Sequence, residues 1–210
     1  MKVKVCGITN VPDAMLCETL GADMLGFIFY AKSKRFVEFS AAEEIIGKLR
    51  PETRKVGVFV NETAGYVNKA AKRLCLSAVQ LHGDESPEEA SKITFPVIKS
   101  FRIKTGFDFS LLNSFKNATP LLDSFAGSQF GGTGTSFDWH IIPDDIKGSI
   151  ILAGGISAAN IGCIYKSIKP YAVDLSSSLE SEPGKKDRNK VQEFFDVLNY
   201  NRTKQSLEVE

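Results

Sequence analysis

The stretch Val56-Gly-Val-Phe-Val60 is a short run of apolar residues, and a second such run, Ala78-Val-Gln-Leu81, starts 22 residues later. Six further runs of the same kind lie to either side of this pair: Val3–Cys6, Met24–Tyr30, Val97–Phe101, Leu121–Phe125, Ile150–Ala153 and Ala172–Leu175. The starts of the eight successive runs lie 21, 32, 22, 19, 24, 29 and 22 residues apart. This spacing is typical of one strand–helix unit per run, so it predicts strands alternating with helices.

Several of the segments between the runs carry helix start signals. Ser40-Ala-Ala-Glu43 has the pattern of a capping box. Ser86-Pro87 places a proline at the first helical position after a serine cap. We also expect one helix from Ser157 to about Ser167 and another after Asp187. The stretch that follows Phe137 contains Pro143 and gives the weakest helix signal.

Eight such units predict an α/β fold of one domain, a (β/α)8 TIM barrel over residues 1–200 followed by a polar C-terminal tail at 201–210. An open, doubly wound sheet is the alternative. Such a sheet usually has fewer strands and a glycine-rich loop after the first strand, whereas here Cys6-Gly7-Ile8-Thr9 follows. The barrel is therefore the favoured architecture.

Composition excludes several classes of protein. The chain has 210 residues, of which 43% are hydrophobic and 24% charged, as in ordinary globular proteins. Lys and Arg number 26 against 25 Asp and Glu, so no global positive charge attracts nucleic acid or a membrane surface. No apolar run approaches the ~18 residues of a membrane helix, and the N-terminal residues do not resemble a signal peptide. We expect a cytoplasmic protein, either a monomer or a homodimer.

The cysteines and histidines do not predict a metal site. The four cysteines, Cys6, Cys17, Cys75 and Cys163, are scattered, and the chain has only two histidines. These residues show no metal-ligand spacing, and a core of this size needs no disulfides, so we expect free thiols and no metal. Except for Cys6, the cysteines fall on predicted helical stretches and are expected to be packing residues.

Polar residues lie at the C-terminal ends of the predicted strands, where barrels of this kind place their chemistry. Because strand side chains alternate between two faces, Lys4 shares a face with Cys6, Gln80 with His82, and Asp174 with Ser176. Lys99 and Asp123 are two further polar residues in otherwise apolar strands. If these faces point inward, thiol, carboxylate, amide, imidazole and ammonium groups gather at the barrel mouth.

Two segments rich in small residues follow the seventh and eighth strands. They are Leu152-Ala-Gly-Gly-Ile156 and Asp174-Leu-Ser-Ser-Ser178. Barrels often bind a substrate phosphate with these two loops, because small residues let backbone N–H groups approach an anion. Gly154-Gly155 alone is equally explained by a tight turn, but two such segments at these two places favour a phosphate site. We expect Gly131-Gly-Thr-Gly134 to form a flexible loop that closes over the site.

Taken together, the motifs resemble the phosphoribosylanthranilate isomerase family of tryptophan biosynthesis. The resemblance extends in one register over about 185 residues and rests on the following motifs: Lys4-Val-Cys-Gly-Ile-Thr9, Gly26-Phe-Ile-Phe-Tyr30, Lys32-Ser-Lys-Arg35, Val56-Gly-Val-Phe-Val-Asn61, Val79-Gln-Leu-His-Gly83, Leu121-Leu-Asp123, Gly131-Gly-Thr-Gly134 with Phe137-Asp-Trp139, Gly154-Gly155, Val173-Asp-Leu-Ser-Ser177 and Pro183-Gly-Lys-Lys-Asp187. It implies a (β/α)8 barrel that performs an Amadori rearrangement of a phosphorylated small molecule without cofactor or metal.

The resemblance also implies roles for individual residues. Cys6 matches the general base and Asp123 the general acid, while Arg35 matches the position that holds the anthranilate carboxylate. Cys6 needs a lowered pKa to act as a base, for which Lys4 or Arg35 is a candidate cause, and Asp123 needs a raised one. The remaining matches are to substrate-binding positions: Gly154, Gly155, Ser176 and Ser177 for the phosphate, with His82 and Asp174 as candidate contacts to ribose hydroxyls. His82 is equally explained as a structural histidine, and Asp174 as the partner of Lys4 or Lys99.

One departure from the family pattern is visible. Ser178 stands where the family usually has glycine, so a position that required positive φ would be strained here and phosphate affinity weakened. Two other functions fit the same motifs. The first is a related phosphosugar isomerase of the histidine-pathway type, which uses aspartate where this chain has Cys6. The second is a non-catalytic barrel that binds a phosphorylated ligand, although such a barrel need not retain both Cys6 and Asp123.

Overall fold

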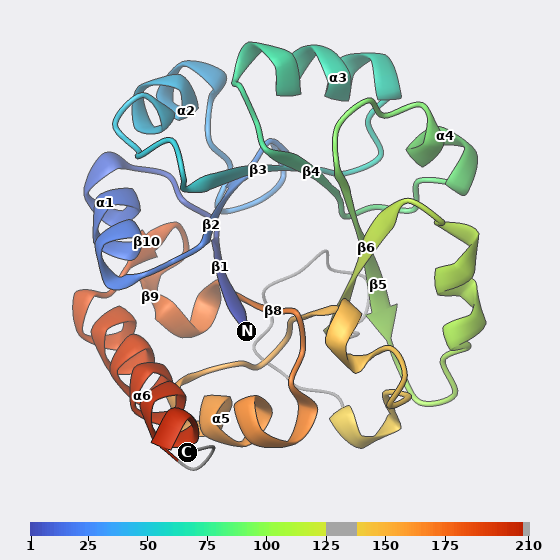
Figure 1. Cartoon of the computed structure of the whole chain (residues 1–210). Coiled ribbons are helices and arrows are strands. Elements are labelled where there is room, and N and C mark those ends of the chain that lie inside the picture. Colours follow the sequence, from blue (N-terminus) through green and yellow to red (C-terminus); the bar gives the residue numbers. More distant parts are fainter. Residues whose placement is uncertain (125–137, 208–210) are drawn as a thin grey trace.

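Eight parallel strands form a closed barrel in a computed structural model that describes residues 1–124 and 138–207. Figure 1 shows the strands as an inner ring with the helices around it. Each strand pairs with the next along the chain, and β1 closes the ring against β8. The strands are β1 (Lys2–Cys6), β2 (Met24–Ile28), β3 (Arg54–Phe59), β4 (Ala78–Leu81), β5 (Val97–Ile103), β6 (Ala118–Ser124), β7 (Ile151–Leu152) and β8 (Ala172–Leu175). The predicted (β/α)8 barrel is confirmed.

Helices of unequal length connect the strands. The α-helices are α1 (Val11–Leu20), α2 (Phe39–Ile46), α3 (Ala64–Arg73), α4 (Pro87–Ser91), α5 (Ala158–Cys163) and α6 (Arg188–Leu207). Short 3-10 turns at Phe109–Ser114, Trp139–Ile141 and Lys147–Ser149 lie after β5 and β6, and α5 continues into a π-helical turn at Ile164–Ile168. After β8 comes a 3-10 turn, Ser177–Leu179, and then a hairpin of β9 (Glu180–Glu182) and β10 (Lys185–Lys186).

The predicted helix starts have mixed outcomes. Ser86 caps α4 as expected, because its side chain accepts a hydrogen bond from Glu89 N, and α5 starts directly after Ser157. The capping box at Ser40 is wrong: α2 begins at Phe39, with Glu38 at its N-cap position and no side-chain cap. The Phe39 ring stacks on Phe29 at 4.7 Å between centroids, so packing rather than a cap determines where α2 begins.

The apolar residues separate into two layers. The larger core lies between the strands and the surrounding helices. A smaller cluster consists of Met24, Val56, Ile98, Leu121, Ile151, Ala153 and Ala172, one or two residues from each of six strands or their ends. Because side chains alternate along a strand, these residues fill the inside of the barrel and leave the strand ends above them for polar groups.

The C-terminal helix extends further than the sequence suggests. The polar residues expected to form a tail from Asn201 are helical as far as Leu207. Asn201 is buried and its Nδ2 donates to the carbonyl of Val197, while Arg202 Nη2 donates to the Met1 carbonyl. Among the described helices, none is both long and apolar enough to cross a membrane.

All four cysteines are free thiols. Cys17 is buried in α1, as expected of a packing residue. The same expectation is wrong for Cys75 and Cys163, which are exposed. Cys75 follows α3 with a left-handed φ of 49° and belongs to the turn that leads into β4.

Candidate active site

A cavity of about 500 Å³ opens at the C-terminal ends of the barrel strands. Its lining includes every residue that the sequence singled out as a site residue: Cys6, Arg35, His82, Asp123, Gly154, Gly155, Asp174, Ser176 and Ser177. These residues come from six separate segments of the chain, and the parallel strands bring them to one face of the barrel.

Cys6 ends β1 and is 7% exposed, with Lys4 and Asp174 as its charged neighbours. Lys4 is fully buried inside the barrel, and its Nζ lies 2.9 Å from Oδ1 of Asp174 on the adjacent strand β8. Burial raises the pKa of the Cys6 thiol, while the charges of Lys4 and Lys186 pull it down. The net effect is an increase, so the lowered pKa expected for Cys6 is wrong for the free protein, because burial outweighs the lysines.

Asp123 lies at the end of β6, and one of its carboxylate oxygens accepts a hydrogen bond of 2.8 Å from Ser124 N. Burial, together with the nearby charge of Asp174, raises the pKa of Asp123 to about 6. A carboxyl group with this pKa keeps a substantial protonated fraction near neutral pH, as a general acid requires. The raised pKa expected from the sequence is therefore present.

His82 lies beside Asp123, with 3.8 Å between Nε2 and Oδ2. Burial and the surrounding cations Lys4, Lys99 and Arg102 lower the pKa of His82 to about 3, so the imidazole is neutral at physiological pH. The amide nitrogen of Gln80 lies 2.9 Å from Nδ1. With Gln80 donating, Nδ1 is the acceptor and Nε2 carries the hydrogen that faces Asp123 and the cavity.

The loops after β7 and β8 border the same cavity. Gly154 has φ 82° and Gly155 has φ 67°, which is left-handed backbone that favours glycine. A Cβ atom at Gly154 would lie 2.5 Å from Ser124 Oγ and 2.9 Å from Ser124 N, so no side chain fits there. Ser176 Oγ is buried and has no hydrogen-bond partner among the described residues. These loops therefore place backbone N–H groups and the unpaired Ser176 hydroxyl at one side of the cavity.

Ser178 also lines the cavity. Among the described residues other than glycine, only Asn61, Cys75 and Lys169 have positive φ. Ser178 is therefore free of the strain that a left-handed position would impose, and its hydroxyl adds a third serine to the loop. The backbone strain expected from replacing glycine at this position does not arise, and the effect on phosphate affinity stays a prediction.

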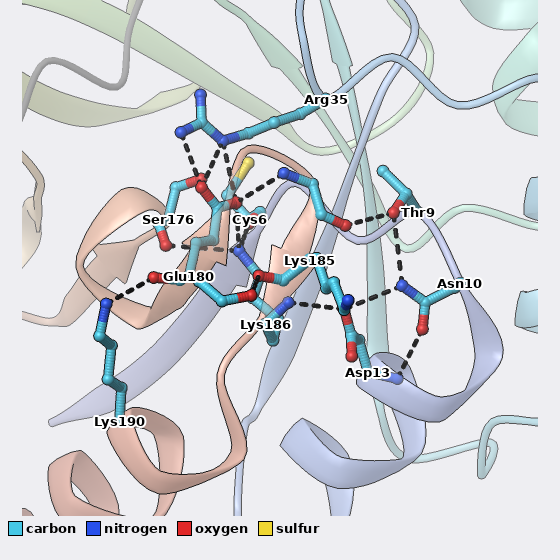
Figure 2. A network of polar contacts seen from close by, with 12 residues as sticks. Cys6, Thr9, Asn10, Asp13, Arg35, Ser176, Glu180, Lys185, Lys186 and Lys190 are labelled. Carbon is cyan, nitrogen blue, oxygen red and sulfur yellow. Dashed lines mark hydrogen bonds and ion pairs between the residues drawn. The ribbon is translucent and has the colours of Figure 1, made fainter.

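Arg35 is mostly buried and is bound by Glu180, a residue to which the sequence analysis gave no role. Figure 2 shows the guanidinium paired with the Glu180 carboxylate, close to Cys6, Ser176 and Lys186. The available sequence signal for Glu180 is its position directly after Leu179, close to the predicted phosphate loop, although Glu182 lies only two residues further on. Nothing local in the sequence pairs it with Arg35, 145 residues away.

Lys99 has a different position from the one expected. Its Nζ lies 2.7 Å from Glu85 Oε2 and 2.7 Å from the Gly83 carbonyl, and it is absent from the cavity lining. Lys99 therefore binds the loop that follows β4, and Asp174 has Lys4 as its partner.

The loop at Gly131–Gly134, predicted to close over the site, lies outside the described residues. Within residues 1–124 and 138–207, no group of three or more His, Cys, Asp or Glu residues could hold a metal ion.

Comparisons with known proteins agree on one family. Residues 3–197 match the family model described as N-(5'phosphoribosyl)anthranilate (PRA) isomerase. The N-(5'-phosphoribosyl)anthranilate isomerase of Geotalea uraniireducens (strain Rf4) is 46% identical over 195 residues, which cover 92% of this chain and 96% of that protein. The corresponding protein of Geobacter sp. (strain M21) is 42% identical over 194 residues, 92% of this chain and 95% of the relative.

Solved structures give the same result. The phosphoribosyl anthranilate isomerase of Thermotoga maritima superimposes with a TM-score of 0.87 at 35% identity, covering 95% of this chain and 99% of the other. A structure of such an isomerase in complex with reduced 1-(o-carboxyphenylamino)-1-deoxyribulose 5-phosphate has a TM-score of 0.84 at 35% identity, with the same coverage. The barrel, the cavity residues and these matches over nearly the whole length show that the chain belongs to the N-(5'-phosphoribosyl)anthranilate isomerase family, a family of isomerases of tryptophan biosynthesis.

Proposed function

We propose that this chain converts N-(5-phosphoribosyl)anthranilate into 1-(2-carboxyphenylamino)-1-deoxyribulose 5-phosphate, with Asp123 as general acid and Cys6 as general base. The observation that supports this assignment of roles is that a thiol and a carboxyl group of raised pKa line one cavity together with the Arg35 guanidinium and two loops of small residues. The rearrangement moves protons and rearranges bonds within one molecule, so it requires an acid and a base.

Asp123 acts first in this mechanism. Its protonated carboxyl group donates to the ribose ring oxygen, the bond between C1 and that oxygen breaks, and the nitrogen lone pair forms a protonated Schiff base at C1. A pKa of about 6 leaves enough of the acid form for this step at neutral pH. Neutral His82, with its Nε2 hydrogen directed toward the same region, is suited to donate a hydrogen bond to a ribose oxygen and not to transfer a proton.

Cys6 acts second. As a thiolate it removes the proton from C2 of the Schiff base, and the C–H electron pair forms the C1–C2 enamine system, which becomes the ketone when C1 gains a proton and the C2 hydroxyl loses one. The raised pKa of Cys6 means that the thiol predominates in the free protein. A protonated Schiff base in the cavity adds a positive charge that favours the thiolate, and Lys4 acts in the same direction.

The two ends of the substrate are anionic, and the cavity has a matching group for each. The side of the cavity that suits the phosphate is bordered by Gly154, Gly155, Ser176, Ser177 and Ser178. There the unpaired Ser176 hydroxyl is available to donate a hydrogen bond to a phosphate oxygen. Arg35 suits the anthranilate carboxylate, because a guanidinium binds a carboxylate through directed hydrogen bonds. Asp174, held by Lys4, is placed to accept a hydrogen bond from a ribose hydroxyl.

The test follows the loss of anthranilate-type fluorescence while phosphoribosylanthranilate is generated in situ from anthranilate and phosphoribosyl pyrophosphate by an added transferase. Cys6→Ser and Asp123→Asn are each expected to lower kcat by about 10²- to 10⁴-fold, the usual contribution of a general acid or base. Cys75→Ser, which changes an exposed thiol outside the cavity, is the matched control and keeps wild-type turnover. Turnover at the wild-type rate in either cavity variant contradicts the assigned role.

A further inference from the structure

The guanidinium of Arg35 is held along one edge by Glu180. Arg35 Nε lies 2.9 Å from Oε1 and 3.0 Å from Oε2 of Glu180, and Nη2 lies 2.7 Å from Oε2. The exposed fractions of the two side chains are 13% and 3%, so solvent does little to weaken the pair. Nη1 makes no hydrogen bond with any described residue, and Figure 2 shows this nitrogen on the side of the guanidinium away from Glu180.

Glu180 is itself held by an ion pair with Lys186. The side chain of Lys186 is completely buried, and its Nζ lies 2.9 Å from Glu180 Oε1. The same Nζ donates to the Cys6 carbonyl at 2.7 Å and to the Ser176 carbonyl at 3.4 Å. Burial opposes ionisation of Glu180, but Arg35 and Lys186 together hold its pKa below the usual value. The carboxylate is therefore charged and bound on two sides.

The aliphatic part of the Arg35 side chain packs closely against the backbone of Gly7. Gly7 has φ 77°, and a Cβ atom at this position would lie 2.6 Å from Arg35 Cδ and 3.2 Å from Ser176 Oγ. Arg35 thus passes directly over the backbone that follows Cys6, in a space that only glycine leaves open. The direction of the stem and the orientation of the guanidinium are set by two independent contacts, Gly7 and Glu180.

The charges of this cluster also favour an anionic ligand. Arg35 and Lys186 contribute two positive charges and Glu180 one negative charge, which leaves one positive charge in a largely buried group. Arg35 lines the cavity, whereas Glu180 and Lys186 do not. An ion pair that served only to close the β9–β10 hairpin would have no need of a partner in the cavity wall.

We propose that Glu180 is a positioning residue for substrate binding: it fixes the Arg35 guanidinium so that Nη1 faces the ring carboxylate, and Lys186 ties this arrangement to the backbone of Cys6 and Ser176. Glu180 and Lys186 thereby connect the three parts of the site: Arg35 for the ring carboxylate, Cys6 for the base and Ser176 for the phosphate. This inference rests on the role proposed above for Arg35. It adds a residue that does not touch the substrate and acts through one that does.

The test separates KM from kcat. Glu180→Gln keeps the shape of the side chain but loses the charge that holds both Arg35 nitrogens, so KM for phosphoribosylanthranilate is expected to rise about tenfold while kcat changes less than about threefold. Glu182→Gln is the matched control on the same hairpin, because Glu182 is exposed and its ion-pair partner among the described residues is the exposed Lys185. This control is expected to leave both constants unchanged.

A double variant shows whether Glu180 acts through Arg35. In the Arg35→Ala background, Glu180→Gln is expected to change KM less than about twofold, because the group that it positions is gone. A second readout is inhibition by reduced 1-(2-carboxyphenylamino)-1-deoxyribulose 5-phosphate and by the same compound without its ring carboxylate. Glu180→Gln is expected to weaken the first inhibitor about tenfold and the second less than about twofold.

Several outcomes overturn the inference. An unchanged KM in Glu180→Gln does so, as does an equal rise with and without Arg35, which indicates a general structural role. If Glu180→Gln does not fold, Glu180→Asp keeps the charge while its shorter side chain cannot reach both Arg35 nitrogens, and the same rise in KM is expected. A wild-type KM in Arg35→Ala refutes the role of Arg35 itself, whereas a raised KM there with a silent Glu180→Gln refutes only the present inference.

Discussion

Asp123 and Cys6 lie in one cavity, and burial raises the pKa of both, with different consequences for their chemistry. For Asp123 the shift brings the pKa to about 6 and makes the carboxyl group a useful acid near neutral pH. For Cys6 the shift disfavours the thiolate that a base requires. At neutral pH most of the free protein therefore has Cys6 as the thiol and Asp123 as the carboxylate. The catalytically competent form, with protonated Asp123 and deprotonated Cys6, is a small fraction.

The pH profile of kcat/KM follows from these two residues. Below about pH 6 Asp123 is already protonated, and the Cys6 thiolate becomes tenfold rarer with each pH unit, so kcat/KM falls. Between about pH 6 and the higher pKa of Cys6, loss of the acid form and gain of the thiolate cancel, and a plateau is expected. The measurement is the initial rate at low substrate concentration from pH 5 to 9. In Asp123→Asn the plateau should disappear, because the residual activity then keeps rising with pH toward the pKa of Cys6. A break near pH 6 that persists in this variant belongs to another group, such as the substrate phosphate.

The raised pKa of Asp123 also predicts a gain in stability when the charge is removed. Ionised Asp123 is less favourable in the folded than in the unfolded protein. The ionised carboxylate therefore lowers the free energy of unfolding by an amount that grows as the pH rises from about 4 through 6. Asp123→Asn is expected to raise the free energy of unfolding by about 3 kcal/mol at pH 8 and by about 1 kcal/mol at pH 4.5. Urea unfolding at the two pH values measures the difference. A change that is the same at both pH values contradicts this assignment.

Among the elements, the β7–α5 loop shows most clearly how backbone geometry shapes the site. Gly154 has φ 82° and would place a Cβ atom against Ser124, whereas Gly106 has φ 77° with nothing within 4 Å. Gly106→Ala is expected to cost only the left-handed conformation, about 1 kcal/mol, and to leave KM unchanged. Gly154→Ala adds the collision with Ser124 and is expected to cost about 2–4 kcal/mol and to raise KM several-fold. Equal losses in both variants would show that the contact with Ser124 has no effect.

At the scale of the whole molecule, the ion pair between Lys4 and Asp174 joins the first and last strands of the ring inside the barrel. Lys4→Met leaves the buried Asp174 without a partner and is expected to cost about 3–5 kcal/mol at pH 8. The loss should shrink at pH 5, because the pKa of Asp174 is already raised by burial and the carboxylate then takes up a proton. Thermal or urea unfolding measures both values. Lys92→Met, which removes the two exposed ion pairs with Glu88 and Glu89 at the end of α4, is the control and should cost less than about 1 kcal/mol.

The sequence by itself determined the order of the strands, the barrel and the face on which the site lies. These features depend on local patterns: eight apolar runs at regular spacing, side chains that alternate along each strand, and small residues after the seventh and eighth strands. The resemblance of its motifs to one family then indicated Cys6, Asp123 and Arg35. Local signals failed where packing decided the outcome, as at the start of α2, where stacking of Phe39 on Phe29 replaced the cap expected at Ser40.

Only the tertiary structure decided the partners and the protonation of the site residues. Glu180 meets Arg35 across 145 residues and Lys4 meets Asp174 across 170, and no local pattern encodes such pairs. The pKa values of Cys6, His82 and Asp123 depend on burial and on charges from several strands at once, so they exist only once the barrel has closed. The physical reason is that strand and helix patterns act over a few residues, whereas desolvation and charge pairing depend on distances in space.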